Sequence, residues 1–370
     1  MRFLLPLAAL LFLGCYQSHG LGDADVGVDA SRPDVPGVDV SGFDAQSPDV
    51  PVLDVFDAGP PRELEWVFLT EDGPPPRYSH YAVYDDARDR MLVWGGVDPY
   101  GPDGCCLEEW VEHEDLWMLD LATNEWTELP PLGRSMLAMP SEVAIDDAKA
   151  YFIASPVNGI GSDFFSLDLE TYELTRLERG PWSGRERPLR VTWDRNEDAL
   201  LVQDMFFSDV RQGMWSYSFR DRSWDAYEAS DSPAPRYHTS LDGAGEGFYM
   251  LGGFGHENDA MAELWQLQDH RWAMRTLSTP LAGRWDHEVV HEARRNTLVV
   301  VAGSQNSTPR STALIDLNTL EVTEPELTPA LPPRRDFSMV LDRRRRRAIV
   351  FGGALRSESA YGDTWALLLP

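Results

Sequence analysis

Basic residues are scarce in this sequence, and this scarcity limits the partners that the protein can have. Its 370 residues include 61 acidic and 32 basic side chains, so the formal net charge at pH 7 is −29. Proteins that bind nucleic acids neutralise the phosphates with clustered lysine and arginine side chains. We therefore expect no nucleic-acid partner.

The short motifs of the common catalytic sites are also missing. The sequence has no G-x-S-x-G nucleophile elbow, no P-loop, no dinucleotide fingerprint and no H-E-x-x-H zinc helix. It has three cysteines, and none of them has the C-x-x-C spacing of a zinc site. The sequence therefore predicts no catalytic residue, metal or cofactor, and whether the protein is an enzyme stays open.

The N-terminus has the features of an export signal. Arg2 precedes an apolar run from Phe3 to Leu13, which is too short to span a membrane because a spanning helix needs about 20 residues. The run continues into Phe12-Leu13-Gly14-Cys15, which resembles the bacterial lipobox. The resemblance implies that residues 1–15 are a lipoprotein signal peptide and that an acylated Cys15 anchors the mature protein in the cell envelope. Tyr16, and not Asp, follows Cys15, which in the lipoprotein family resembles a signal for sorting to the outer membrane. The alternative is an ordinary signal peptide and a secreted protein.

The next segment has a different composition. Between residues 21 and 62, aspartates recur about every five residues among Val, Pro, Gly and Ala, and the aromatic residues are limited to Phe43 and Phe56. Such a segment buries too little apolar surface to offset its chain entropy, and its like charges repel one another. It contains no calcium-binding loop of the D-x-[DN]-x-[DN]-G type. We expect residues 16–63 to be a disordered linker between the membrane and a folded domain.

A repeat of about fifty residues covers the remainder of the chain. Its clearest part alternates apolar and polar residues, which is typical of a half-buried strand. The six copies of this part begin at Asp115, Asp163, Gly213, Glu263, Ser311 and Asp363. Most copies are followed by a polar turn and another strand, such as Glu125–Leu129. Two strands precede each copy, and the second of them often ends in a glycine pair, as at Gly95-Gly96, Gly252-Gly253 and Gly352-Gly353. Each unit starts with an entry segment that ends in arginine, at Arg77, Arg134, Arg185, Arg236, Arg284 and Arg334.

Four short strands per unit, a glycine pair after the second strand and a tryptophan after the third resemble the kelch repeat. The resemblance implies that residues 64–370 are an all-β domain, a six-bladed kelch-type β-propeller with four antiparallel strands per blade. The last unit ends after its third strand, at Pro370, whereas Glu65–Leu69 has the pattern of a fourth strand. We therefore expect the N-terminal strand to complete the last blade, which leaves no open sheet edge.

Candidate binding residues lie in the entry segments. In this topology the entry segments and the loops between strands two and three share one face, where their side chains can surround the mouth of the central channel. A ring of arginine and histidine side chains is suited to an anionic sugar or a carboxylate. The candidates are Arg77, His80, Arg236, His238, Arg284 and His287. The resemblance also implies an alternative, because in kelch proteins these arginines and histidines mostly hold neighbouring blades together.

Two other segments attract attention. The longest loop, residues 98–114, lies on the same face and contains Cys105 and Cys106. A disulfide between them would be strained, because adjacent Cα atoms are about 3.8 Å apart and the usual disulfide range is about 4.4–6.8 Å. Free thiols and intermolecular bridges are the alternatives. On the opposite face, Arg343–Arg347 falls in the turn between strands one and two, and we expect a solvated turn that pairs with neighbouring carboxylates.

These observations predict a cell-envelope lipoprotein whose propeller is a binding module for a protein or carbohydrate ligand. The ligand is expected on the face with the entry segments, because long loops on a rigid scaffold commonly carry binding residues. The alternative is a propeller enzyme that acts on a sugar and resembles the bacterial sialic acid mutarotases or, less closely, galactose oxidase.

Overall fold

A computed structural model describes the chain from residue 63 to residue 370, apart from the stretches 99–110, 135, 137–142, 147, 155–162, 182–186, 195–196, 207–210, 245–246, 256–258, 306–307, 310–311 and 357–358. The predicted signal peptide with Cys15, nearly all of the predicted linker, and the Cys105-Cys106 pair lie outside the described residues. No helix in the described part of the chain is long and apolar enough to cross a membrane.

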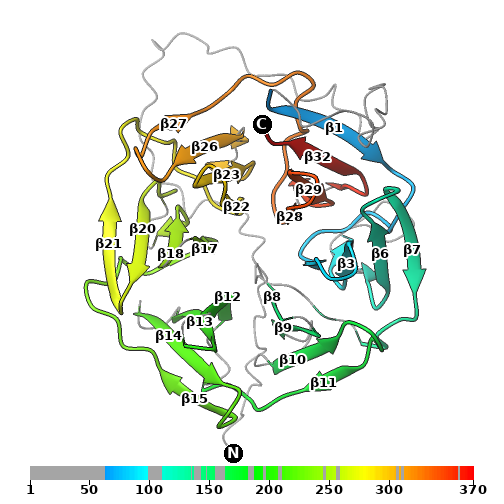
Figure 1. The fold of residues 1–370 in the computed structure, drawn as a ribbon, viewed down its shortest axis with the longest axis horizontal. Helices are drawn as coiled ribbons and strands as arrows, with labels where there is room; N and C mark the ends of the chain where they lie inside the picture. The colour runs from blue at the N-terminus through cyan, green and yellow to red at the C-terminus, as the bar shows by residue number, and fades with distance from the viewer. Residues whose placement is uncertain are drawn as a thin grey trace, which may run out of the picture. The chain divides into compact units, whose positions relative to one another are not determined.

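The strands form six four-stranded antiparallel sheets around a central axis, and Figure 1 shows each sheet as one blade. From the axis outward, blade 1 contains β2 (Tyr81–Asp85), β3 (Arg90–Trp94), β6 (Leu116–Asp120) and β7 (Glu125–Leu129). Blade 2 contains β8 (Ala144–Ile145), β9 (Lys149–Ala154), β10 (Asp163–Asp168) and β11 (Leu174–Arg176). Blade 3 contains β12 (Arg187–Asp194), β13 (Ala199–Phe206), β14 (Arg211–Ser218) and β15 (Ser223–Ala226).

The other half of the ring has the same order of strands. Blade 4 contains β17 (Ser240–Ala244), β18 (Gly247–Leu251), β20 (Leu264–Gln268) and β21 (Arg271–Arg275). Blade 5 contains β22 (Glu288–Glu292), β23 (Thr297–Val301), β26 (Ala313–Asp316) and β27 (Val322–Thr323). Blade 6 contains β28 (Ser338–Asp342), β29 (Arg347–Phe351), β32 (Thr364–Leu368) and β1 (Glu65–Thr70). The six-bladed propeller predicted from the repeat is confirmed.

Short two-stranded ribbons extend the connections between the second and third strands. They pair β4 (Val97–Asp98) with β5 (Val111–Glu112), β16 (Arg236–Tyr237) with β19 (Phe254–Gly255), β24 (Ser304–Gln305) with β25 (Thr308–Pro309), and β30 (Ala354–Arg356) with β31 (Ser359–Ala360). The β4–β5 ribbon is the base of the longest loop. Since β16 belongs to an entry segment and β19 to a connection, their pairing places both on the same face of the propeller.

The first strand of the chain closes the ring. β1 pairs antiparallel with β32, with Trp66 opposite Leu367 and Val67 opposite Ala366. Strand β1 is thus the outermost strand of the blade whose other strands come from the C-terminus, as the sequence predicts. This pairing covers the edge that β32 would otherwise expose.

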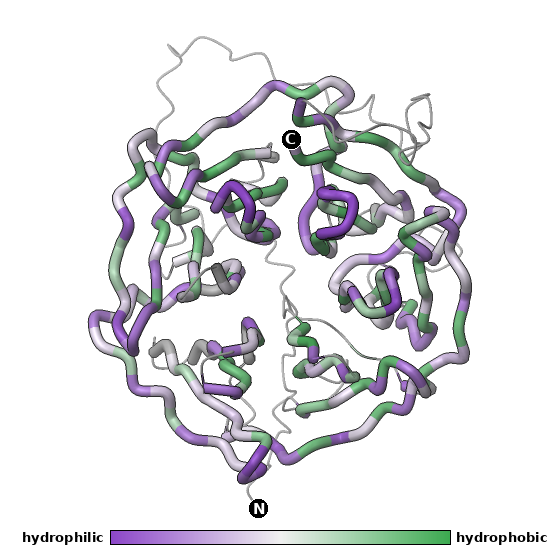
Figure 2. Tube along the Cα trace, viewed as in Figure 1, coloured by the Kyte–Doolittle hydropathy of each residue, from purple (hydrophilic) through white to green (hydrophobic). Residues whose placement is uncertain are grey.

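The described core consists of six apolar clusters, one at each boundary between neighbouring blades. Successive side chains of a strand point to opposite faces, so one strand contributes to two clusters. In β1, Trp66 and Phe68 join the cluster between blades 5 and 6, whereas Val67 and Leu69 join the cluster between blades 6 and 1. Figure 2 shows hydrophilic residues in many of the turns, whereas hydrophobic and hydrophilic residues are interspersed along the strands. Packing between blades therefore holds the ring together.

Glycines after the second strands let the entry segment of the next blade approach closely. Gly352 and Gly353 have φ values of 66° and 93°, which few residues other than glycine adopt. The amide of Gly353 donates a 2.9 Å hydrogen bond to the carbonyl of Arg77, and a Cβ on Gly352 would lie 2.7 Å from the same oxygen. The equivalent bonds run from Gly253 to Arg284, from Gly303 to Arg334 and from Gly96 to Met136. Met136, and not the predicted Arg134, therefore occupies the entry position of blade 2.

Candidate functional site

A cavity of about 330 Å³ lies on the propeller axis, and the innermost strands of all six blades contribute to its wall. Apolar residues such as Val143 and Ile145 line this wall together with charged ones. The charged and imidazole side chains that line it are His80, Arg190, Asp242, Asp286, Glu288, His291, Asp336 and Arg343. The cavity is thus a polar site at the place where the blades converge, and its volume falls at the lower end of the usual range for small-molecule pockets.

The predicted entry arginines lie inside the blades and not at the mouth of this cavity. Arg77, Arg236 and Arg284 are 1 % exposed or less. Each forms an ion pair with an acidic residue: Arg77 with Asp115 at 2.6 Å, Arg236 with Glu263 at 2.6 Å, and Arg284 with Glu324 at 3.1 Å. Because the guanidinium groups are buried and paired, they stabilise the entry segments and present almost no surface to a ligand.

Two of the predicted histidines connect neighbouring blades. His80 of blade 1 shares a 2.8 Å hydrogen bond with Ser338 of blade 6, and His287 of blade 5 shares a 3.2 Å bond with Ser240 of blade 4. Burial lowers the pKa of both imidazoles, and the adjacent entry arginines lower it further, so both are neutral at pH 7. The structure therefore places these side chains in the blade-connecting role that the resemblance offered as the alternative.

The third histidine, His238, belongs to a different cluster of residues. It stands two positions after the entry arginine of blade 4, and Asp286 and Asp336 stand two positions after those of blades 5 and 6. All three have a left-handed backbone, with φ of 57°, 52° and 53°. Their potential ligand atoms, an imidazole nitrogen and two carboxylate oxygens, all lie within 4.8 Å of one another. We call these three residues the axial triad.

The axial triad contains two carboxyl groups and an imidazole in a largely buried setting. The side chains of His238, Asp286 and Asp336 are 17 %, 1 % and 15 % exposed. The imidazole Nδ1 of His238 contacts Oδ1 of Asp286, and the guanidinium of Arg335 lies 3.9 Å from each carboxylate. Burial opposes protonation of His238, but the charges of Asp286 and Asp336 outweigh it and raise its pKa. Burial, followed by the charge of Asp286, raises the pKa of Asp336 to about 7.

Farther along the axis, two more carboxylates face the cavity. Glu288 pairs with the buried Arg190 at 3.6 Å, and Asp242 accepts a 2.7 Å hydrogen bond from the backbone amide of His291. Burial raises the pKa of Glu288, and it raises the pKa of Asp242 to about 6. The cavity therefore contains acidic groups at several depths, with Arg190 as a buried positive charge among them.

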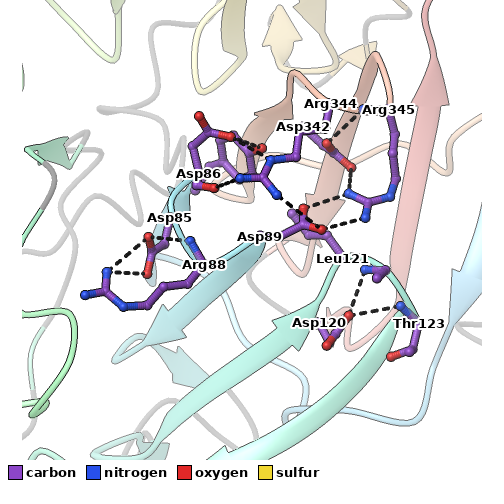
Figure 3. A network of polar contacts seen from close by, with 12 residues as sticks. Asp85, Asp86, Arg88, Asp89, Asp120, Leu121, Thr123, Asp342, Arg344 and Arg345 are labelled. Carbon is purple, nitrogen blue, oxygen red and sulfur yellow. Dashed lines mark hydrogen bonds and ion pairs between the residues drawn. The ribbon is translucent and has the colours of Figure 1, made fainter.

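The arginine-rich turn on the opposite face pairs with carboxylates, as predicted. Arg343–Arg347 spans the turn from β28 to the start of β29, and Figure 3 shows its contacts with the corresponding turn of blade 1. Arg345 forms a bidentate pair with Asp89 at 2.6 and 2.7 Å, and Arg344 pairs with Asp86 at 3.1 Å. These arginines connect blades 6 and 1, so the turn is not an unsatisfied cationic patch.

The last arginine of the turn forms a buried ion pair of a kind that recurs in the fold. Arg347 pairs with Asp342, its neighbour in the β-ladder, at 2.9 Å and donates a 2.6 Å bond to the carbonyl of Leu121 in blade 1. Arg90 and Asp85 form the equivalent pair in blade 1, where Arg90 donates to a backbone carbonyl of blade 2. In both pairs the arginine therefore connects its blade to the next one.

The sequence interpretation did not include Asp286 and Asp336 among the candidate site residues, although it identified the entry arginines Arg284 and Arg334 that stand two positions before them. The signal was available, because both occupy the position of His238 when the entry segments are aligned on their arginines. The predicted acylation of Cys15 and the predicted Cys105-Cys106 chemistry fall outside the described residues. A comparison with models of known protein families finds none that matches this sequence.

Proposed function

We propose that this protein is a kelch-type propeller lipoprotein of the cell envelope that binds a small polar ligand of the carbohydrate class. The observation that carries the binding role is the axial cavity of about 330 Å³, whose wall contains both apolar and charged residues. Sugars present apolar C–H faces together with many hydroxyl groups, and a wall of this kind offers both packing surface and hydrogen-bonding groups. A cavity of this size is suited to a single sugar unit.

The kelch assignment is supported by the positions of the repeat residues. The glycine pairs adopt positive φ directly beneath the entry segment of the following blade. The tryptophans of the outer strands have a shared role, because the indoles of Trp66 and Trp126 donate hydrogen bonds to threonines of the preceding blade at 3.1 and 3.0 Å. The repeat residues thus act at blade boundaries, where a repeat protein needs them.

The envelope location rests on the N-terminal sequence. The Phe12-Leu13-Gly14-Cys15 motif supports lipid attachment, and an acyl chain would hold the propeller at a membrane. The acidic linker supports a role as a spacer, because like charges extend such a chain.

A cavity-filling variant tests the binding role. Ala82 lines the cavity, whereas Ala273 is exposed on the outer strand β21, so Ala82→Trp and Ala273→Trp add the same side chain in two places. Binding of a panel of neutral, amino and acidic monosaccharides is measured by saturation-transfer NMR and calorimetry. We expect Ala82→Trp to abolish the binding that wild type and Ala273→Trp show. Failure of the wild type to bind any sugar, or unchanged binding by a folded Ala82→Trp variant, would contradict the proposal.

A further inference from the structure

The axial triad brings together three metal-ligating groups from three separate blades. His238, Asp286 and Asp336 are about fifty residues apart in sequence, yet their ligand atoms lie within 4.8 Å of one another. One imidazole nitrogen with carboxylate oxygens is a donor set that suits divalent transition metals.

The backbone holds these residues in place. The amide of Asp286 donates a 3.3 Å hydrogen bond to the carbonyl of His238, and the amide of Ser79 donates a 2.9 Å bond to the carbonyl of Asp336. Residues at the same position of neighbouring blades are therefore connected directly. The imidazole of His238 also packs edge-on against Trp285, with ring centroids 5.5 Å apart. The triad is thus organised by the scaffold before any ligand arrives.

The triad brings two carboxyl groups to one point beside an imidazole. Asp286 and Asp336 are both largely buried, and their oxygens lie within 4.8 Å of each other and of the His238 nitrogen. The guanidinium of Arg335 lies 3.9 Å from each carboxylate, beyond hydrogen-bonding distance. A divalent cation between the two carboxyl groups could be coordinated by both.

We propose that His238, Asp286 and Asp336 bind a divalent transition-metal ion of the Zn²⁺ or Mn²⁺ class. Protein ligands of such ions lie about 2.0–2.2 Å from the metal, which places ligand atoms roughly 3–3.5 Å apart. The ligand atoms lie within 4.8 Å of one another, so binding would draw the more distant of them together. His238 and Asp286, which contact each other directly, separate to admit the ion.

Three protein ligands leave at least one coordination position open. Asp286 and Asp336 also line the axial cavity, so the open position faces the cavity. A hydroxyl or carboxylate oxygen of a bound molecule can occupy it. The metal site goes beyond the proposed sugar binding, and metal affinity is measurable without any sugar, so the two proposals succeed or fail separately.

The test is titration of the full-length, chelator-treated protein with ZnCl₂ and MnCl₂ in a calorimeter, with CoCl₂ absorption spectra as a second readout. We expect one saturable site in the wild type. His238→Ala and Asp336→Asn should weaken it by more than about 100-fold, because the loss of outer-shell partners alone costs 10–100-fold. Asp242→Asn is the matched control, since it removes a carboxylate from the same cavity outside the triad.

Each outcome decides the question. Saturable binding that is lost in the two triad variants and kept in Asp242→Asn supports the metal site, with far-UV circular dichroism showing that all the variants are folded. Absence of saturable binding in the wild type overturns it, and so does equal binding by wild type and folded triad variants. If a triad variant fails to fold, the absorption spectrum of the wild type with Co²⁺ still tests the proposal. A spectrum that lacks the ligand-field bands of a protein-bound ion overturns it.

Discussion

Replacement of Trp66 by alanine tests whether closure by β1 stabilises the whole ring. Trp66 is 1 % exposed and belongs to the cluster between blades 5 and 6, and its indole nitrogen donates a 3.1 Å hydrogen bond to Thr312. Truncation of a buried tryptophan costs about 3–5 kcal/mol. At about 2 °C per kcal/mol for a domain of this size, the melting temperature should fall by about 6–10 °C.

Trp126→Ala is the matched control. Trp126 occupies the corresponding position of β7 and donates a 3.0 Å bond to Thr364, but it is only half-buried and belongs to blade 1, not to the closing strand itself. Thermal unfolding is followed by far-UV circular dichroism, and the midpoint of the transition is compared between variants. We expect the decrease for Trp126→Ala to be less than half of that for Trp66→Ala. Equal decreases, or a Trp66→Ala variant that melts like wild type, would refute the reasoning. A chain that begins at Gly73 lacks β1 altogether and should melt lower still.

Three further predictions follow from the anchor, the buried ion pairs and the cavity. Cys15→Ser should abolish labelling by a radioactive fatty acid and move the protein from the membrane to the soluble fraction; membrane retention would refute lipid anchoring. Asp342→Asn should lower the free energy of unfolding, measured by chemical denaturation, by about 3–5 kcal/mol, because both side chains of the Asp342–Arg347 pair are fully buried and the substitution leaves the charge of Arg347 uncompensated. The ion pair of Asp86 is exposed, so Asp86→Asn should lower it by less than about 1 kcal/mol. Burial raises the pKa of Asp242 from 3.8 to about 6, so the native state binds this proton more tightly than the unfolded state does. The stability that this protonation contributes is fully present below about pH 4 and is lost as the pH rises through about 6. Asp242→Asn should therefore gain stability relative to wild type between about pH 4 and pH 7, and a difference that does not change with pH would contradict this assignment.

The fold was predictable because alternation of apolar and polar residues reports strand burial directly. Glu125–Leu129 was predicted as a strand and is one, with the same bounds. The entry of blade 2 was misassigned to Arg134, because the sequence does not show which carbonyl accepts the hydrogen bond from the glycine amide of the preceding blade. That carbonyl belongs to Met136, which has no side-chain feature in common with arginine.

The site was less accessible to sequence reasoning. Arg236 and His238 stand two residues apart in one entry segment, yet Arg236 turns into its blade toward Glu263, whereas His238 joins two aspartates at the axis. His238 has a left-handed backbone, and the alternation of apolar and polar residues does not show which residue of an entry segment adopts that conformation. Convergence of three blades on one point is also a long-range property that local patterns do not contain.

Closure by β1 also has a consequence for the order of folding. Trp66 pairs opposite Leu367, about 300 residues later, and bringing such distant segments together costs about 5 kcal/mol of chain entropy. Blades 1 to 5 are built from contiguous segments and can form as the chain emerges, but blade 6 waits for the final strand. Until then β1 has no neighbouring strand, and the faces of blades 5 and 1 that pack against blade 6 are uncovered. A chain in this state is prone to associate with other chains. Folding of this protein should therefore be limited by the last step of ring closure, and a prolyl or disulfide step is not needed to make it slow.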